Sequence, residues 1–303
     1  MSTILVSGLI NIETTLQIES FPVEYQPATY PFFGVNSTVS GVGYNIAKAL
    51  TALGDRVQFG SLIGADLAGK LVLEALKQDN IPETWILQNL GQTAQSVILF
   101  DHNGKRAINV DLKNMQETPY PVGFTNSLIA RCDLAVLCNI NFSRPLLAKV
   151  QQAGIPVVTD VHSISDIEDD YNRDFMQYAD ILFMSHERLP CPPEEWAIEL
   201  QERYGTEIIV IGLGERGALL SVKSENFMSL VPAVQTRPIL NTIGAGDALL
   251  SAFVHCYVKR ESPLIALQKA VIFASHKIGE RSAAAGFLTE SQLNAYYEDG
   301  LGH

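Results

Sequence analysis

Paired cysteines, positive charge and long apolar stretches are all scarce in this sequence, and each shortage excludes a class of protein. The four cysteines show no C-x-x-C spacing, which argues against a metal or disulfide set, and we expect reduced thiols in a cytoplasmic protein. Residues 1–12 have no basic region, which favours a strand over a signal peptide. The apolar stretch after Asp247 is too short and too interrupted to span a bilayer.

Basic residues are outnumbered by acidic ones. The sequence has 21 Lys and Arg against 33 Asp and Glu, a formal net charge of -12. We therefore expect neither nucleic acid nor an anionic membrane as the main partner, and an anionic ligand needs a local site. There is also no internal repeat, low-complexity tract or flexible linker. With 303 residues, 47% of them hydrophobic, the chain can form a large core, and we expect one domain over residues 1–303.

Short apolar runs alternate with helical patterns along most of the chain. The runs cover residues 4–9, 57–63, 134–138, 156–160, 181–184 and 208–211. Helical spacing of apolar residues is found at residues 40–54, 68–78, 194–204, 264–277 and 290–297. This alternation predicts an α/β fold, with a doubly wound, mainly parallel sheet and helices on both faces.

Two segments interrupt the alternation. Residues 93–100 and 105–110 flank an Asp-His-Asn-Gly sequence, whose Asn-Gly pair predicts the tight turn of a β-hairpin. Residues 19–33 are rich in proline and aromatic residues and lack a helical period. We expect a small β lid over the substrate, built from about residues 11–38 and 92–112, which is also the candidate surface for a homodimer. Its aromatic residues Tyr30, Phe32 and Phe33 either stack on a base or pack a small core within the lid.

Polar residues follow the first strand and open the first helix. Asn11 and Glu13 come directly after the run at residues 4–9, and ligands of open α/β sheets bind outside the carboxyl ends of the strands. Asn45 lies in the first turn of the helix that follows a glycine turn, where it either reaches into a pocket or caps the helix. A surface turn accounts for Asn11 and Glu13 equally well.

The most informative stretch is NTIGAGD at residues 241–247, followed by an apolar helix pattern at residues 248–258. Gly244 and Gly246 permit a tight turn, and the free N–H groups at a helix N-terminus form an anion site without any lysine. The helix dipole should keep Asp247 ionised near neutral pH. Beside a bound phosphate, such a carboxylate suits the role of acceptor for a hydroxyl proton. The alternative is a turn that packs a helix closely against a strand, with Asp247 as a simple cap.

Residues 212–217 match G-x-G-x-x-G, the pattern of a dinucleotide site. Such a site needs a helix directly after the glycines, but residues 218–222 form a second apolar run. We therefore expect a hairpin here and not a dinucleotide-binding turn.

Taken in order, these motifs resemble the ribokinase-like sugar kinases, also called the phosphofructokinase B family, over essentially the whole chain. NIE at residues 11–13 is similar to the family's N-x-D, and SGVGYN at residues 40–45 to its G-G-x-G-x-N. The hairpin at residues 93–110 resembles the lid strands, and GLGERGALL at residues 212–220 the nucleotide-side hairpin. NTIGAGD resembles the D-T-x-G-A-G-D signature, which is the most specific of these matches.

The resemblance implies a kinase that uses ATP to phosphorylate a hydroxymethyl group of a sugar or a sugar-containing molecule. Asp247 would be the catalytic base, and the anion hole for the transferring phosphoryl group would be Gly244, Ala245 and Gly246. The residues implied for substrate hydroxyls are Asn11, Glu13, Gly41, Asn45 and, more loosely, Asn141. Those implied for the nucleotide are Gly214 and Gly217 at the phosphates or ribose, and His276, Lys277, Gly279 and Ala283 at the adenine. Mg²⁺ would bridge the phosphates largely through water, with Glu187 as the carboxylate that contacts one of these waters.

The sequence also departs from the family pattern. Asn241 replaces the first aspartate of the signature, which in many relatives helps to bind an activating monovalent cation, so we expect weak dependence on potassium. Glu13 is one methylene longer than the family's aspartate, and Ser40 stands where relatives often have glycine. Two other functions stay open: a nucleoside kinase of the same family, and a weakly catalytic sugar or nucleotide binder with a regulatory role. The retained Asp247 favours an enzyme.

Overall fold

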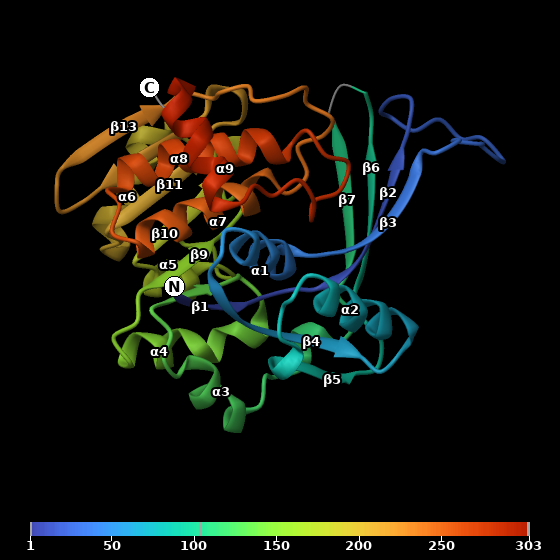
Figure 1. Cartoon of the computed structure of the whole chain (residues 1–303), viewed down its shortest axis with the longest axis horizontal. Helices are drawn as coiled ribbons and strands as arrows, with labels where there is room; N and C mark the ends of the chain where they lie inside the picture. The colour runs from blue at the N-terminus through green and yellow to red at the C-terminus, as the bar shows by residue number, and fades with distance from the viewer. Residues whose placement is uncertain (1, 103–104, 302–303) are drawn as a thin grey trace.

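Within residues 2–102 and 105–301, which the computed structural model describes, a nine-stranded sheet forms the centre of the molecule (Figure 1). In sheet order its strands are β13 (Phe227–Val231), β12 (Ala218–Val222), β11 (Ile208–Gly212), β10 (Ile181–Ser185), β9 (Val157–Asp160), β8 (Leu134–Leu137), β1 (Thr3–Ser7), β4 (Arg56–Gly64) and β5 (Ile86–Leu90). Neighbouring strands from β11 to β5 pair in parallel, and β12 and β13 are antiparallel. The predicted mainly parallel sheet is confirmed.

Helices cover both faces of this sheet, as the sequence predicts. In β1 the side chains of Ile4 and Val6 join one apolar cluster and that of Leu5 joins the other, because successive residues of a strand point to opposite faces. The first cluster includes side chains of α1 (Val42–Ala52), α2 (Leu67–Gln78), α7 (Ala245–Val258), α8 (Pro263–Lys277) and α9 (Glu290–Tyr296). The second includes side chains of α3 (Val122–Ile129), α4 (Arg144–Gln152), α5 (Arg173–Tyr178) and α6 (Pro193–Tyr204).

Helix α7 is buried on almost all sides, since it packs against both α1 and α8. This burial is the reason that most of its residues are apolar, and its polar side chains Asp247, Ser251 and His255 are buried as well. Shorter helical turns connect the main elements: η1 (Glu83–Trp85), η2 (Met115–Glu117), η3 (Asn141–Ser143), η4 (His186–Arg188), η5 (Gly214–Arg216) and η6 (Tyr297–Leu301).

A second sheet of four strands stands beside the main body and forms the lid (Figure 1). Its order is β3 (Val35–Ser40), β2 (Asn11–Gln17), β6 (Gln95–Phe100) and β7 (Arg106–Asp111). The antiparallel pair β6–β7 is the predicted hairpin, although its Asn-Gly turn at residues 103–104 lies outside the described residues. The lid strands begin and end within a few residues of the expected lid segments.

The segment between β2 and β3 carries large side chains that face solvent. Tyr30 is 78% exposed, Phe32 86% and Phe33 96%. Of the two roles that the sequence left open for these rings, packing of a small core within the lid is therefore excluded. Exposed rings of this size are available to a ligand or to another protein surface.

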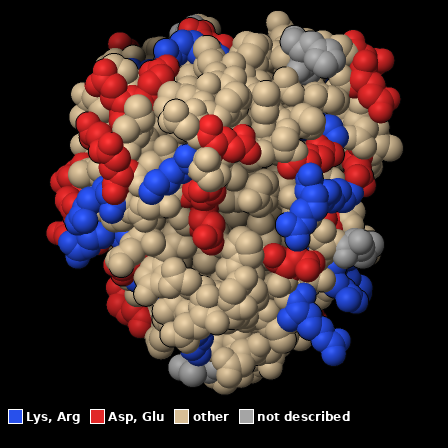
Figure 2. Space-filling view, turned by 90° about the vertical axis from the view of Figure 1, so that its left-hand side faces the viewer, with Lys and Arg blue, Asp and Glu red and all other residues tan. Residues whose placement is uncertain are grey.

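Charge on the described surface follows the composition. On the face shown in Figure 2, acidic and basic side chains are interspersed around a broad uncharged area. None of the helices in the described part of the chain is long and apolar enough to cross a membrane.

Candidate active site

The turn that opens α7 has the geometry that its glycines predict. Gly244 has a left-handed backbone with φ of 76°, and the helix begins at Ala245. A Cβ atom on Gly244 would lie 2.9 Å from the carbonyl oxygen of Ala283, so the facing loop leaves no room for a side chain. Gly246 is exposed, and its N–H and that of Asp247 lie in the first turn, where no intrahelical acceptor exists. The turn can therefore hold an anion.

Asp247 is buried in the first turn of α7, with 9% of its surface exposed. Its Oδ2 accepts a hydrogen bond of 2.7 Å from Nδ2 of Asn45, which links α7 to the start of α1. Burial raises the pKa of Asp247 to about 6, and the Asn45 hydrogen bond and the positive charges of His162 and Lys277 oppose this rise. The cost of removing the carboxylate from water thus outweighs the stabilisation of its ionised form by the helix dipole, which the sequence suggests. The ionised form of Asp247 still predominates at pH 7.

Ser40 connects Asp247 and Asn45 with a second buried carboxylate, Glu13. The Oγ atom of Ser40 lies 3.1 Å from Oε2 of Glu13 and 3.2 Å from Oδ1 of Asn45. Since a hydroxyl has one proton, Ser40 donates to one of these oxygens at a time. Burial raises the pKa of Glu13 and the hydrogen bond from Ser40 lowers it, while the negative charge of Asp247 raises it further. The serine that departs from the family pattern therefore joins the two carboxylates.

Asn11 and Glu13 each present an unused oxygen at this site. Nδ2 of Asn11 donates to Oγ of Ser96 in the lid strand β6, at 3.0 Å. Oδ1 of Asn11 and Oε1 of Glu13 are buried and have no hydrogen-bond partner among the described residues. A buried acceptor without a hydrogen-bond partner destabilises the protein, so a ligand whose hydroxyl groups donate to these two oxygens would be favoured here.

Gly41 supports Asn45 from the backbone. It precedes α1 with φ of 109°, and its carbonyl oxygen accepts the N–H of Asn45 at 2.8 Å. The sequence left open whether Asn45 caps the helix or reaches into a pocket. The structure directs its side chain to Ser40 and Asp247.

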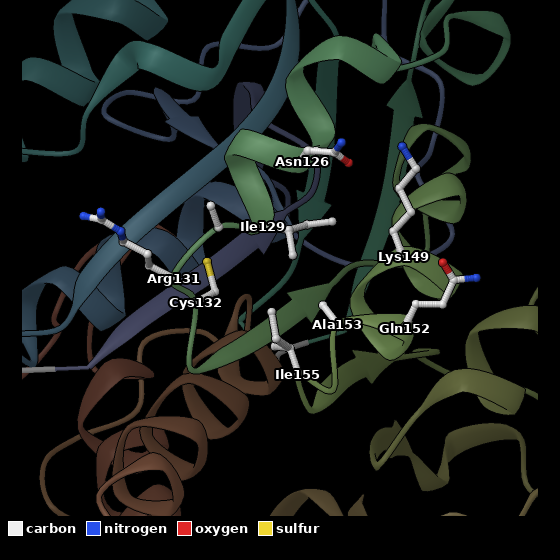
Figure 3. Close-up of a pocket in the computed structure, with 9 residues that line it drawn as sticks. Asn126, Ile129, Arg131, Cys132, Lys149, Gln152, Ala153 and Ile155 are labelled. Atoms are coloured by element: carbon white, nitrogen blue, oxygen red, sulfur yellow. The ribbon is translucent and has the colours of Figure 1, made fainter.

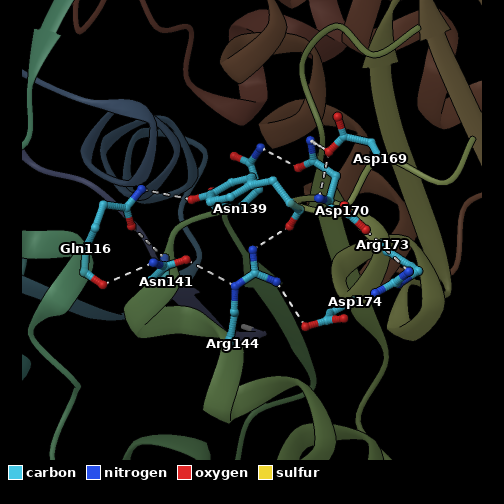
Figure 4. A network of polar contacts seen from close by, with 10 residues as sticks. Gln116, Asn139, Asn141, Arg144, Asp169, Asp170, Arg173 and Asp174 are labelled. Carbon is cyan, nitrogen blue, oxygen red and sulfur yellow. Dashed lines mark hydrogen bonds and ion pairs between the residues drawn. The ribbon is translucent and has the colours of Figure 1, made fainter. Parts of the chain in front are cut away.

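Asn141 belongs to a separate polar network near the end of β8 (Figure 4). Its Nδ2 donates to the carbonyl oxygen of Gln116 at 3.0 Å, and its Oδ1 accepts from Nε of Arg144 at 3.1 Å. Arg144 in turn binds Asp174 through Nη1 at 3.0 Å and the carbonyl oxygen of Tyr171 through Nη2. These contacts orient Asn141 but do not connect it to the Glu13–Asp247 chain.

The turn between β11 and β12 is a hairpin, because these strands pair antiparallel. The expectation that residues 212–217 form no dinucleotide-type turn is confirmed. Within this turn Gly214 lies beside the ring of His186, and Gly217 packs against the carbonyl oxygen of Val231.

The end of α8 carries three of the residues that the family resemblance implies for the adenine. His276 lies at the surface edge, with Nδ1 at 3.1 Å from the carbonyl oxygen of Gly286, and burial lowers its pKa. Gly279 is covered by the side chain of Arg237. The side chain of Lys277 is fully buried, and its Nζ donates to the carbonyl oxygen of Ile243. Lys277 therefore does not line a surface open to adenine, and it contacts the glycine turn from within the protein.

Glu187 is the residue that the resemblance implies for a metal-bound water. It is exposed in η4, after the end of β10, and its N–H lies 3.4 Å from Oγ of Ser185. The described residues contain no group of three or more His, Cys, Asp and Glu side chains that could hold a metal ion by themselves.

Two further residues near the glycine turn come from distant elements. Asp160 ends β9, and its Oδ2 lies 3.8 Å from the position of a Cβ on Gly246. Its place at the carboxyl end of a strand is a signal that the sequence does contain. Arg106 begins the lid strand β7, and its Nη1 donates to Oγ1 of Thr242 at 2.7 Å. Nothing in the sequence indicates this contact, because it depends on how the lid lies over the turn.

A cavity of about 550 Å³ lies elsewhere, between α3 and α4 (Figure 3). Its lining includes Cys132 and Ile155, which precede β8 and β9, so it lies at the amino ends of these strands. Asn11, Asp160 and the other site residues follow the carboxyl ends. The cavity is therefore not part of the candidate active site.

The fold and this site define a class of protein. A doubly wound sheet carries a helix N-terminus that can hold an anion, and a buried carboxylate stands in the same helical turn. This arrangement suits the transfer of a phosphoryl group to a hydroxyl group.

The chain belongs to the pfkB family of carbohydrate kinases, whose family model matches residues 1–290. By this membership it is a phosphotransferase that acts on an alcohol group.

Relatives at low identity extend over most of the chain. The fructosamine kinase FrlD of Bacillus subtilis is 24% identical over 245 residues, 79% of this chain and 83% of its own length. The ribokinase of Arabidopsis thaliana is 26% identical over 291 residues, 90% of this chain and 75% of its own length. A solved structure of A. thaliana ribokinase with ribose and ATP has a TM-score of 0.82 at 20% identity, and covers 97% of this chain and 98% of its own. The microbiome-derived acarbose kinase Mak1 has a TM-score of 0.86 at 22% identity, with 97% and 98% of the two chains covered.

Proposed function

We propose that this protein uses ATP to phosphorylate a hydroxymethyl group of an uncharged sugar or sugar-like molecule. The observation that carries the proposal is the chain of buried polar groups from Glu13 through Ser40 and Asn45 to Asp247, beside the anion-binding turn. In the proposed reaction Glu13 holds the substrate and Asp247 accepts its proton. The complex of A. thaliana ribokinase with ribose and ATP supports ATP as the phosphoryl donor.

Asp247 acts as the general base in this mechanism. Asn45 engages its Oδ2, which fixes the plane of the carboxylate and leaves Oδ1 for the substrate hydroxyl. A phosphoryl-transfer transition state needs positioning and charge stabilisation more than a strong base, so a pKa of about 6 is sufficient. The hydroxyl oxygen would bond to the γ-phosphorus of ATP while the bond from that phosphorus to the bridging oxygen breaks and ADP leaves; Asp247 would take the hydroxyl proton and carry it until the product departs.

The glycine turn and the lid supply positive electrostatic potential. The N–H groups of the first turn of α7 point at the transferring phosphoryl group, and they are already oriented before the reaction. Arg106 reaches the same turn from β7, and its guanidinium group adds a full positive charge. Closure of the lid would bring Arg106 and the substrate together and would exclude water that otherwise hydrolyses ATP.

A magnesium ion fits this site as a water-mediated partner. Asp160 beside Gly246 and Glu187 in η4 are the carboxylates that would hold its water molecules, because Mg²⁺ keeps several waters when it binds nucleotide phosphates. The ion supplies charge neutralisation for the phosphates. Asn241 brings no carboxylate to the turn, and we propose that potassium has little effect on turnover.

The substrate we propose has several hydroxyl groups and no phosphate. The unused acceptors Oδ1 of Asn11 and Oε1 of Glu13 call for hydroxyl donors. Arg144 donates to Asn141, Asp174 and Tyr171 through its three guanidinium nitrogens. No pair of its N–H groups is therefore left to bind a phosphate. The names of the relatives include ribose, fructosamine and acarbose, which share this polyhydroxylated chemistry.

A substrate screen tests the proposal. Thermal stabilisation and ATP turnover would be measured across monosaccharides, fructosamines, oligosaccharides and nucleosides. Turnover with at least one uncharged sugar is the expected result. Stabilisation by sugars without any turnover would favour a regulatory binder instead.

A nucleoside kinase is the second candidate, and the exposed rings of Tyr30, Phe32 and Phe33 favour it. Aromatic rings of the lid can stack on a nucleobase when the lid closes. In the same screen, turnover of nucleosides well above that of free sugars would select this alternative.

We also propose that the lid mediates a homodimer. Ile108 and Val110 are 51% and 48% exposed on one face of the β6–β7 hairpin, and Val97 is 46% exposed on the opposite face. A second copy of the lid would cover the exposed apolar side chains of one of these faces. Light scattering of the wild type and of an Ile108→Lys variant tests this idea. Because the proposed reaction uses ATP, we propose that the protein acts in the cytoplasm. We also propose that residues 1–303 form one domain.

A further inference from the structure

Lys277 is the last residue of α8, and its side chain is completely buried. Lysine is almost never buried to this extent unless its charge has a partner. Its Nζ donates to the carbonyl oxygen of Ile243, the residue that directly precedes Gly244. The ammonium group is therefore attached to the start of the anion-binding turn.

The peptide groups on both sides of Ile243 are held by neighbouring side chains. Oδ1 of Asn241 accepts the N–H of Ile243 at 2.9 Å, and Lys277 binds its carbonyl oxygen. Nδ2 of Asn241 also donates to the carbonyl oxygens of Glu280 and Arg281 at 2.9 and 2.8 Å. An asparagine can tie these loops together, but it brings no charge, so the positive charge at this place comes from Lys277.

Charged groups from four elements act on Lys277. Three carboxylates attract it, and one guanidinium group repels it: Asp247 in α7, Glu13 in β2, Glu280 after α8, and Arg106 in β7. Burial lowers the pKa of Lys277 to about 8, and the carboxylates oppose this effect. The ammonium group is therefore mainly charged at pH 7, and it interacts electrostatically with the two carboxylates of the proposed site.

We propose that Lys277 is a built-in cation of the active site, a positioning residue that holds the glycine turn through Ile243 and balances the charges of Asp247 and Glu13. This role provides the charge that a bound monovalent cation would otherwise bring. The catalytic consequence rests on the proposed kinase function, whereas the cation site itself does not.

The first test measures stability and needs no substrate. Lys277→Ala vacates the space of the ammonium group and leaves the carbonyl oxygen and carboxylates in place. We expect its melting temperature to be lowered in tetramethylammonium chloride and largely restored in ammonium or potassium chloride of equal concentration. The matched control is Lys269→Met, which removes a buried lysine of the same helix that pairs with Glu261 at 2.7 Å. The control and the wild type should not respond selectively to these cations.

The second test uses the pH profile of kcat, which a purely structural role would not change. The other charged groups that act on Asp247, Asp160 and His162, stay in place in every variant. Lys277→Met removes the positive charge with little change of shape, so the acid limb of the profile should move up by about one pH unit and kcat should fall about 10- to 100-fold. Lys277→Arg keeps the charge and should keep the wild-type limb.

The outcomes distinguish a failure of the role proposed for Lys277 from a failure of the proposed kinase function. If potassium and ammonium leave Lys277→Ala no more stable than tetramethylammonium does, the built-in cation is refuted. An unchanged acid limb in a folded Lys277→Met variant refutes it as well. If the wild type phosphorylates nothing in the substrate screen, the kinase proposal fails, and the stability test still decides the role of Lys277.

Discussion

Replacing Asp247 by asparagine should remove catalysis and at the same time stabilise the protein at neutral pH. The amide has the shape of the carboxylate, and its Oδ1 can still accept the hydrogen bond of 2.7 Å from Asn45. It cannot accept a proton, so kcat should fall about 100- to 10,000-fold, while the KM for the sugar changes little.

The effect on stability follows from the pKa of Asp247. Burial raises this pKa from 3.8 to about 6, which corresponds to about 3 kcal/mol of unfavourable free energy for the ionised folded form. Because the pKa of Asp247 is higher in the folded state than in the unfolded state, its ionisation destabilises the folded protein. This destabilisation is absent below pH 3.8 and complete above about pH 6. An unpaired buried amide N–H₂ group costs about 1–3 kcal/mol at every pH. The stability of the variant relative to the wild type should therefore rise by about 2–3 kcal/mol as the pH goes from 4 to 7.5. With the cost of the amide subtracted, the net stabilisation at pH 7.5 is about 0–2 kcal/mol.

Urea unfolding at several pH values, together with steady-state kinetics, would measure both effects. Asp170→Asn is the matched control, because the Asp170 side chain is 94% exposed and the same change there should alter neither quantity. A variant with near wild-type kcat would refute the assignment of Asp247 as the base. A stability difference that does not depend on pH would refute the argument from burial.

The remaining predictions concern the groups around Asp247. Ser40→Ala removes the hydroxyl beside Glu13 and should raise the KM for the sugar about fivefold, since a buried hydrogen bond contributes about 1 kcal/mol; an unchanged KM in steady-state kinetics would contradict this. Gly244→Ala places a Cβ atom 2.9 Å from a carbonyl oxygen, and it should lower the free energy of unfolding by about 1–3 kcal/mol and weaken ATP binding in calorimetry. Gly54→Ala, with φ of 93° but nothing within 4 Å of its Cβ position, is the control and should keep ATP affinity. Arg106 is exposed, so the Arg106→Gln variant should fold normally, yet its kcat should fall about 10- to 100-fold. An equal fall of kcat in the control Lys105→Gln would show a general effect of charge and would contradict a specific role of Arg106.

Local features of the fold follow from the sequence because they depend on residues that are close along the chain. The apolar run at residues 208–211 becomes β11, and the run at residues 218–222 becomes β12. Their antiparallel pairing follows from the absence of a helix between them. The start of α7 at Ala245 follows from Gly244, which takes a backbone conformation that other residues avoid.

Long-range features of the site could not be predicted in this way. The exposure of Phe33 excludes one of the two roles that the sequence left open for it, and the sequence could not decide this, since a short aromatic stretch does not show whether a partner surface exists. The buried position of the Lys277 side chain could not be predicted for a similar reason: the helix end is recognisable, but the direction of its last side chain depends on the loop that packs on it.

By itself, the sequence determined the alternation of most strands and helices, the glycine turn and the carboxylate that stands in it, because turn chemistry and periodicity act over a few residues; β5, β13 and α3 were not predicted. Only the tertiary structure decided which groups surround that carboxylate. Asn45 and Asp247 are 202 positions apart, and Arg106 and Thr242 are 136 apart. Contacts at such separations depend on the order of the strands and on the position of the lid, and the burial that sets the pKa of Asp247 depends on them as well.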